Sequence, residues 1–378
     1  MRFALAAALL ALPLAARAQA PETLDEKACM EVVKKIEAAV AAADGEAFDE
    51  VLGLRVILEK IVKDLETEDK NKKDFIEGVM SASLGTQITD QLTAGGTIKF
   101  LRLHVVDGRT RALFRMLNPN GGVNYHDWIL VKDGDGARTE DLYIYLMGES
   151  LARTFKREFL KGIAVMSKAP GNLKGWEKDF LDAQPKVAEM QAAVKDGDSK
   201  KALKIYNDLP QTVREDKLTM IQRVSIALEV GDAEYTAALA DWEKLFPGDP
   251  SMDLMQIDAF AMKGEFEKSA DVVARLAKTI GGDPFLDGMR AGLFLQAGKL
   301  DEATASAEKA AKEEKGLALP HFVLLQVSLK KKDHAATVRE LTVLEKECGV
   351  PILDFEAEEG FESFVESEEY KKWKEGRK

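Results

Sequence analysis

The sequence predicts an α+β domain of helices and an antiparallel sheet, followed by an all-α array of repeated helix pairs. Apolar residues between positions 97 and 147 recur at every second position, as in strands, whereas those before and after this segment recur at helical spacing. Four glycines (Gly197, Gly231, Gly264 and Gly298) then follow one another at intervals of 34, 33 and 34 residues. Such a constant interval is typical of a helical repeat.

The chain begins with a segment typical of a secretory signal peptide. A basic start at Arg2 precedes an apolar run over residues 4–16, and Ala16-Arg17-Ala18 supplies a small-x-small cleavage site. The run is shorter than the roughly 18 apolar residues that a membrane-spanning helix needs. We expect residues 1–18 to be removed as a signal peptide. The mature protein is expected to be periplasmic or secreted by a bacterium, without stable membrane insertion.

The net charge and the number of cysteines limit the classes of partner and cofactor that this protein is expected to bind. The net charge is −12 at pH 7 and no basic patch is evident, which argues against nucleic acid or an anionic membrane as a partner. The acidic run over residues 354–369 is either a solvated helix face or a docking segment. Cys29 and Cys348 either form a disulfide or, as their amphipathic surroundings favour, stay as buried free thiols. No metal or cofactor is expected, because two cysteines without suitably spaced histidines do not make a zinc site.

The first domain is expected to start with helices. Apolar residues at helical spacing predict helices over 24–43, 48–61 and 75–84, the last ended by Gly85, with a charged loop over 66–73.

Four strands are expected next, over 97–106, 109–117, 123–132 and 140–147, before a helix over 150–161. Asp107-Gly108 suits a type I′ hairpin. The resulting register sets Leu101 opposite Phe114 and Phe100 opposite Arg115. One face of this hairpin is then apolar, and the other is cationic. Asp133-Gly134-Asp135-Gly136 is interpreted as a tight turn rather than a calcium loop, because an oxygen ligand and the closing Glu are missing.

The cationic face carries Arg102, His104, Arg111 and Arg115. It is either the solvated side of the sheet or a site for an anion.

This order of helices followed by an antiparallel meander resembles the NTF2-like (cystatin-like cone) fold. The last strands that carry the resemblance are Tyr125-His126-Asp127-Trp128-Ile129-Leu130-Val131 and Asp141-Leu142-Tyr143-Ile144-Tyr145. The resemblance implies a curved sheet wrapped over the helices, in a domain spanning 22–165. Enzymes of that fold use an Asp/His or Tyr/Asp pair inside the cone, which makes Tyr125, His126, Asp141 and Tyr143 the cone-pocket candidates. No motif assigns catalytic roles to them. A linker is expected over 166–182, around Ala169-Pro170-Gly171-Asn172.

The glycine ladder is accompanied by further regular positions. In the first repeat, Ala202, Tyr206 and Leu209 follow Gly197 by five, nine and twelve residues, and the third and fourth repeats keep these offsets. The second repeat has two extra residues in its turn, and a degenerate fifth has Lys332 at the glycine position. This pattern resembles the tetratricopeptide repeat (TPR) and implies a solenoid over 183–350. An acidic capping helix and tail over 351–378 would close its end.

TPR arrays bind partners in a concave groove lined by the first helix of each pair. The residues expected there are mostly apolar, so the TPR carboxylate clamp, which needs Lys and Asn, is not expected. These peptide-groove candidates are Leu218, Ile221, Ser225, Leu254, Met255, Asp258, Phe285, Met289, Phe322 and Gln326. They either take an apolar peptide or helix, or pack the superhelix and dock on the first domain.

Two functions therefore compete. The first is a non-catalytic exported adaptor that binds a protein or peptide through the TPR groove. The second is small-molecule binding or hydro-lyase-like activity in the cone. The absence of any nucleophile elbow, phosphate loop or zinc signature favours the adaptor.

Overall fold

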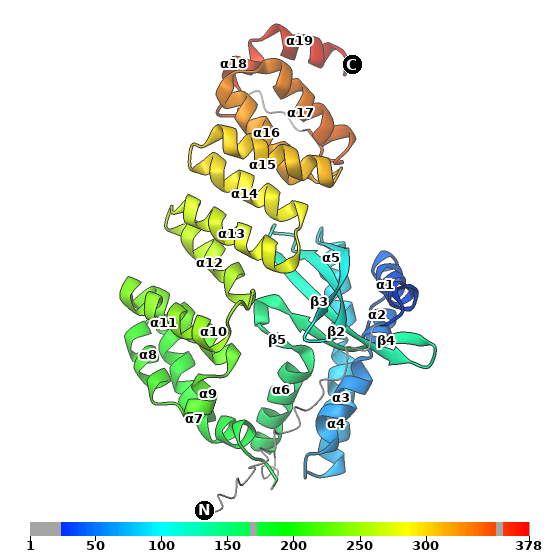
Figure 1. The fold of residues 1–378 in the computed structure, drawn as a ribbon, viewed down its shortest axis with the longest axis vertical. Coiled ribbons are helices and arrows are strands. Elements are labelled where there is room, and N and C mark those ends of the chain that lie inside the picture. The colour runs from blue at the N-terminus through cyan, green and yellow to red at the C-terminus, as the bar shows by residue number, and fades with distance from the viewer. Residues whose placement is uncertain (1–23, 167–171, 353–357, 378) are drawn as a thin grey trace, which may run out of the picture.

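The structure, a computed structural model, describes residues 24–166, 172–352 and 358–377, so the expected signal peptide lies outside the described residues. Helices come first, then a five-stranded antiparallel sheet, then a long helical array (Figure 1). The sheet lies beside the middle of the array, and the first helices cover the opposite side of the sheet (Figure 1). Among the described helices, none is both long and apolar enough to cross a membrane.

The N-terminal region has five helices where three were expected: α1 (Glu26–Ala41), α2 (Gly45–Leu52), α3 (Leu54–Lys63), α4 (Asp69–Ala82) and α5 (Leu84–Thr93). Gly53 splits the expected second helix because its φ is 68°, in the left-handed region. The expected loop over 66–73 contains the start of α4. Gly85 does not end a helix; it lies in the first turn of α5, where a Cβ atom would come within 2.1 Å of the Gly45 carbonyl oxygen. This glycine permits α2 and α5 to touch.

The sheet contains β1 (Thr97–Val106), β2 (Arg109–Leu117), β3 (Val123–Asp133), β4 (Gly136–Ile144) and the short β5 (Glu149–Ser150), in that spatial order. Asp107 and Gly108 have φ values of 51° and 73°, as a type I′ turn requires. The turn after β3 is tight, since Asp133 pairs with Gly136. The expected fourth strand starts earlier and stops at Ile144, and residues 145–147 form the 3₁₀ helix η1 (Tyr145–Met147).

The predicted β1–β2 register is correct from Arg102 to the turn but wrong for Leu101 and Phe100. A bulge between Phe100 and Arg102 sets Phe100 opposite Phe114, instead of Leu101. The bulge turns the Phe100 ring toward the core, where it packs edge-on at 5.4 Å from the Phe114 ring. It also sets Lys99 beside Arg115.

The two faces of the sheet have different partners. Trp128 and Phe114 lie on the face that packs against α1–α3, where the Phe48 ring meets Trp128 at 5.3 Å. Leu113 and Tyr125 lie on the other face and pack against the array. Both faces are therefore covered, and the sheet joins the two halves of the molecule.

After α6 (Leu151–Met166), consecutive helices pair in the array. The pairs are α7 (Trp176–Lys195) with α8 (Ser199–Asn207), α10 (Lys217–Val230) with α11 (Asp232–Leu245), α12 (Ser251–Met262) with α13 (Phe266–Ile280), α14 (Pro284–Gln296) with α15 (Leu300–Glu313), and α16 (Ala318–Lys331) with α17 (His334–Lys346); the one-turn helix α9 (Gln211–Arg214) precedes α10.

The ladder glycines each lie at the turn inside a pair, and the small residues that follow them are fully buried. Ala202, Ala238, Ser269, Ala303 and Thr337 all have no exposed surface. These side chains are small because the second helix of each pair crosses the first there. In the degenerate repeat, Lys332 adopts a φ of 54° where the other repeats have glycine.

The ends of the array differ in detail from expectation. Residues 176–182 of the expected linker already belong to α7, because Trp176 and Phe180 stack at 4.9 Å and pack against α6. Residues 167–171 lie outside the described part. At the C-terminus, α18 (Glu362–Val365) and α19 (Glu368–Glu375) place Phe364 and Tyr370 on α17, as a cap would.

Both cysteines are free thiols and belong to different hydrophobic clusters. Cys29 is fully buried in α1, and Cys348 is half-buried after α17.

Candidate functional site

The array has an apolar pocket of about 580 Å³ between α7, the start of α8, and α10, which we call the α7–α10 pocket. Met190, Ile221 and Ile226 form its buried floor, and Val194 projects into it with 46% of its surface exposed. Its volume lies within the range of pockets that bind ligands. The α7–α10 pocket can therefore take an apolar side chain without rearranging the helices.

Polar side chains surround this floor. Gln191 and Gln222 bring amides that donate and accept, and Ser225 brings an exposed hydroxyl. Lys195 and Glu229 lie at the C-terminal ends of α7 and α10, exposed, and within the described part of the chain neither forms an ion pair. The rim thus balances one cation with one anion, and the lining carries no net formal charge.

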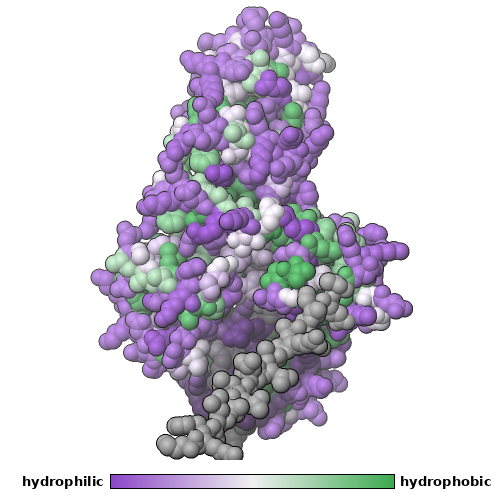
Figure 2. Space-filling view, in the orientation of Figure 1, coloured by the Kyte–Doolittle hydropathy of each residue, from purple (hydrophilic) through white to green (hydrophobic). Residues whose placement is uncertain are grey.

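The ten groove candidates separate into three groups. Ile221, Leu254 and Phe285 are buried, whereas Leu218, Met255 and Met289 are half-buried. The exposed ones are Ser225, Asp258, Phe322 and Gln326. Only Ile221 and Ser225 of the ten line the α7–α10 pocket. Figure 2 shows one face of the molecule, on which hydrophilic residues predominate and apolar patches are small and separate.

The middle of the expected groove is occupied by the sheet. Leu254 and Met289 pack in one hydrophobic cluster with Leu113 and Tyr125. The Phe285 ring lies 5.3 Å below the Arg115 guanidinium. These candidates dock on the first domain, which leaves no room at them for a peptide.

The cationic face of the sheet is neither solvated nor open to an anion, which corrects both sequence-based interpretations. Arg115 is 3% exposed and is held by Asp283 at 2.7 Å and by Glu314 at 2.7 Å. Arg102 donates to the carbonyl oxygens of Gly281 and Gly282 in the turn after α13. The array therefore supplies two carboxylates for Arg115 and two backbone carbonyl oxygens for Arg102.

The other two cations of that face pair within the sheet. Asp127, with no exposed surface, is 2.7 Å from His104 Nε2 and accepts from Arg111 at 3.1 Å. Its two oxygens are thereby occupied.

The cone-pocket candidates are not brought together. Tyr125 is fully buried, and its hydroxyl donates to Asp283 at 2.8 Å; burial and the nearby carboxylate raise its pKa well above the usual value. His126 faces the opposite side, in the core, where burial lowers its pKa to about 4. Asp141 accepts from the backbone N–H groups of Leu142 and Ala152, and although burial raises its pKa, it serves to fix the start of α6.

Tyr143 belongs to the interface with the array. Its hydroxyl donates to Asp249 at 3.2 Å, accepts from Lys217 at 3.1 Å and lies 3.1 Å from the Ser251 hydroxyl. Lys217 also pairs with Asp249. Burial opposes the positive charge of Lys217, but the nearby Tyr143 and Asp249 outweigh burial and raise the pKa of Lys217. The Lys217 amine is therefore held protonated and is a poor nucleophile.

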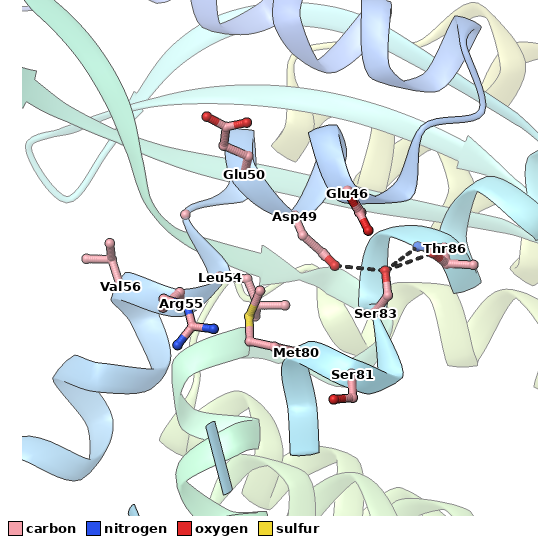
Figure 3. A pocket seen from close by; sticks show the side chains of 11 residues that line it. Glu46, Asp49, Glu50, Leu54, Arg55, Val56, Met80, Ser81, Ser83 and Thr86 are labelled. Atoms are coloured by element: carbon pink, nitrogen blue, oxygen red, sulfur yellow. Dashed lines mark hydrogen bonds between the residues drawn. The ribbon is translucent and has the colours of Figure 1, made fainter. Parts of the chain in front are cut away.

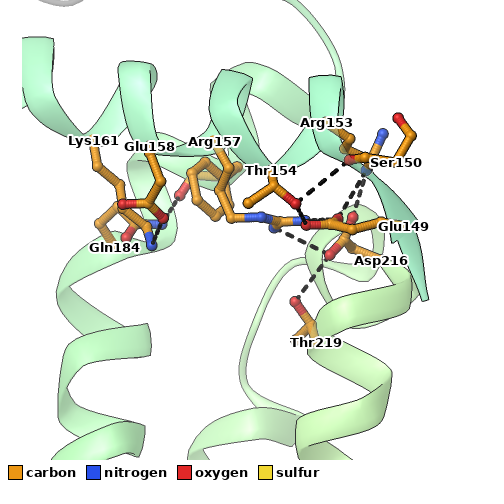
Figure 4. A network of polar contacts seen from close by, with 11 residues as sticks. Glu149, Ser150, Arg153, Thr154, Arg157, Glu158, Lys161, Gln184, Asp216 and Thr219 are labelled. Carbon is orange, nitrogen blue, oxygen red and sulfur yellow. Dashed lines mark hydrogen bonds and ion pairs between the residues drawn. The ribbon is translucent and has the colours of Figure 1, made fainter. Parts of the chain in front are cut away.

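A second ionic network joins α6 to α10 (Figure 4). Arg157, 3% exposed, donates to Glu149 at 2.6 Å and lies 3.2 Å from Asp216, while Arg153 binds Asp216 at 2.5 Å. Thr154 also donates to Glu149. Two cations and two carboxylates balance there, so the network carries no net charge and connects α6 to the start of α10.

A larger pocket of about 700 Å³ lies among α2–α5 (Figure 3). At its wall, buried Asp49 accepts from the Ser83 hydroxyl at 2.9 Å and from the Gly85 N–H at 2.7 Å. Burial outweighs these two hydrogen bonds and raises the pKa of Asp49. Both oxygens of Asp49 are used to fix the start of α5, a structural role.

The residues that sequence reasoning missed lie in the turns between repeats. Asp249, Asp283 and Glu314 each follow the second helix of a pair and face the sheet. One local signal was available: Asp283 precedes Pro284, as an N-cap residue does before a proline at the first helical position. Nothing local indicated that its other oxygen binds Tyr125.

No protein-family model matches the chain, and no curated protein matches it. Among solved structures, the chain is similar to residues 41–end of MamA from Desulfovibrio magneticus RS-1, with 15% identity and a TM-score of 0.34, over 43% of this chain and 93% of that one. A MamA RS-1 ArsTM double mutant has 14% identity and a TM-score of 0.34 over the same shares. Similarity at this level does not establish a family, and the resemblances to TPR and NTF2-like proteins stay predictions.

Proposed function

We propose that this protein is an exported, non-catalytic adaptor that binds an apolar segment of a protein or peptide partner in the α7–α10 pocket. The observation that carries the proposal is the partly exposed Val194 above a buried floor of Met190, Ile221 and Ile226. Burying one aliphatic side chain of a partner there contributes about 1.5–3 kcal/mol. Paired helices of TPR type commonly present such a groove to partners, which agrees with this role.

Export is part of the proposal and rests on the N-terminal signal segment. The partner is accordingly expected outside the cytoplasm.

The competing function, small-molecule binding or hydro-lyase-like chemistry in the cone, lacks a comparable supporting observation. Tyr125, Asp141 and Tyr143 each hold structural hydrogen bonds, and His126 lies on the other face of the sheet. Neither the α7–α10 pocket nor the pocket among α2–α5 is lined by any of these four residues.

The test compares two valines that are exposed to similar extents. Val194 is 46% exposed in the α7–α10 pocket, and Val56 is 54% exposed on α3, away from the array. Tagged wild-type, Val194→Glu and Val56→Glu proteins are used to isolate partners from a periplasmic extract. Binding is expected to weaken at least about tenfold only in Val194→Glu, because a carboxylate is costly to bury against an apolar side chain.

A crosslinking experiment locates the contact directly. A photo-crosslinking residue at exposed Ser225 is expected to capture the same partner, and Val194→Glu is expected to abolish that crosslink. If both glutamate variants retain every partner at wild-type levels, the α7–α10 pocket is not the binding site.

A further inference from the structure

A different pocket, of about 590 Å³, lies where α3, α6 and α7 meet, and we call it the basic pocket. Three cations, Arg153, Lys156 and Lys174, contribute to its wall, against one carboxylate, Glu177. Arg153 is also paired with Asp216 and Lys156 with Glu177, which leaves the charge of Lys174 unbalanced at the wall, in a chain whose net charge is −12. Such a local excess of positive charge attracts anions.

Two of the three cations of the basic pocket, Arg153 and Lys156, are held in place before any ligand arrives. The Arg153 guanidinium stacks 4.2 Å above the Trp176 ring and is anchored from behind by Asp216, yet 43% of its side chain is exposed. Lys156 pairs with Glu177. Because these side chains are already ordered, binding loses little conformational entropy.

Unused donors accompany these charges. Lys174 is exposed and has no hydrogen bond or ion pair within the described part of the chain. The indole N–H of Trp176 is buried without an acceptor. At the first turn of α7, Gly175 offers no side-chain cap. Lys174 is thus a donor that a ligand in the basic pocket can reach, and a ligand that pairs with it brings an acceptor.

The rest of the wall is apolar. The Trp176 ring is half-buried, and Ile61 reaches the pocket from α3. The volume is ample for a small organic molecule rather than a bare ion.

We infer that the basic pocket binds a small organic phosphate, with the phosphate group on Lys174 and Arg153 and the organic part against Trp176 and Ile61. Two of the three cations already have carboxylate partners, so the free Lys174 gives the largest new charge-assisted contact. The site is separate from the α7–α10 pocket and does not depend on the proposed function.

Calorimetric titration at constant ionic strength tests this with three probes: phenyl phosphate, inorganic phosphate and phenol. Saturable binding is expected for phenyl phosphate, binding about tenfold weaker for inorganic phosphate because the apolar contact with Trp176 and Ile61 is missing, and none for phenol. Lys174→Gln is expected to weaken phenyl phosphate about tenfold. Lys178→Gln is the control, since Lys178 is exposed on α7, pairs with Asp182 and does not line the pocket.

Three results would overturn the inference. One is the absence of saturable phenyl phosphate binding to the wild-type protein. Another is an equal loss of affinity in the Lys174→Gln and Lys178→Gln variants. The third is inorganic phosphate binding as tightly as phenyl phosphate, because the organic part would then go unrecognised.

Discussion

Replacing Arg115 by methionine removes the cation on which two carboxylates of the array depend. The guanidinium lies 2.7 Å from Asp283 and 2.7 Å from Glu314, with a third hydrogen bond of 3.0 Å to the second Glu314 oxygen. Arg115 is 3% exposed, and the Asp283 side chain has no exposed surface. Methionine keeps much of the apolar stem, so the change is mainly electrostatic.

Breaking a buried ion pair by removing one partner costs about 3–5 kcal/mol. Glu314 is partly protected, because Lys99 remains at 2.9 Å. Among the residues that the structure describes, Asp283 then keeps the Tyr125 hydroxyl at 2.8 Å and the Phe285 N–H at 3.1 Å, both neutral donors. We therefore expect Arg115→Met to lower the free energy of unfolding by about 3 kcal/mol, the lower end of that range.

Urea unfolding at pH 7, followed by circular dichroism, measures this loss. Arg115→Met combined with Asp283→Asn is expected to recover more than about 1 kcal/mol, because no uncompensated charge then stays buried at position 283. A loss below about 1 kcal/mol for Arg115→Met alone, the value of an exposed ion pair, would refute the reasoning.

The same contact has a pH signature. Burial opposes the ionisation of Glu314, but hydrogen bonds from Arg115 and Lys99 outweigh it and hold the pKa of Glu314 below its usual 4.5. A folded-state pKa below the unfolded one contributes stability that is complete above pH 4.5 and is lost as the pH falls through the folded value. Arg115→Met removes much of this contribution, so the two stability curves are expected to converge at acid pH.

Three further outcomes are expected in the same assay or in thermal melts. Gly85→Ala is expected to lower the free energy of unfolding by about 3 kcal/mol, because its Cβ would lie 2.1 Å from the Gly45 oxygen. Gly78→Ala, with open space around it in α4, is expected to raise it by about 0.5–1 kcal/mol. Similar stabilities of the two variants would contradict this explanation. Lys332→Gly is expected to raise the free energy of unfolding by about 0.5–1 kcal/mol, because glycine adopts a φ of 54° without strain. A decrease in stability would contradict the presence of strain at Lys332. Burial lowers the pKa of His126 from 6.5 to about 4, so stability is expected to fall as the pH drops from 6.5 toward 4; His126→Leu should flatten that slope, and an unchanged slope would contradict the assignment.

Elements set by local pattern were predicted well from sequence. The bounds of β1 and β2 and the Asp107-Gly108 turn agree with the structure, because alternation and turn chemistry act over a few residues. The ladder glycines likewise lie at the turns between paired helices, and the side chain five residues after Gly197, Ala202, is fully buried. These features need no knowledge of the rest of the fold.

Elements that depend on distant contacts were not predicted. The helix α5 was missed because Gly85 was interpreted as a helix end, although it permits a close approach to Gly45, 40 residues earlier. The β1 bulge at Leu101 depends on where Phe100 meets the core. The hydrogen bonds from Arg115 span 168 residues to Asp283 and 199 to Glu314. No periodicity in one segment carries information about such a partner.

From the sequence, the cationic face was either solvated or a site for an anion, and the groove candidates either took an apolar peptide or packed the superhelix and docked on the first domain. Docking on the first domain is correct for Leu254, Phe285 and Met289, and the same contact overturns both interpretations of the cationic face. The two surfaces are the halves of one interface: Arg115 and Arg102 meet acidic side chains and carbonyls in the repeat turns, while Leu113 meets Leu254 beside them. Docking of the groove on the first domain could be proposed from the sequence, but nothing in the sequence indicated that the cationic face takes part in that interface.

The interface also limits where a partner can bind. The sheet covers the middle repeats, through α12 and α14, but the α7–α10 pocket lies before them and the 43%-exposed Phe322 of α16 lies after them. Because the sheet is fixed there by buried charges, exposing the middle of the groove would require separating Arg115 from Asp283 and Glu314. Such opening would also expose the apolar side chains of the interface, among them Leu113 and Leu254. A partner that binds without rearranging the protein is therefore expected at the ends of the array.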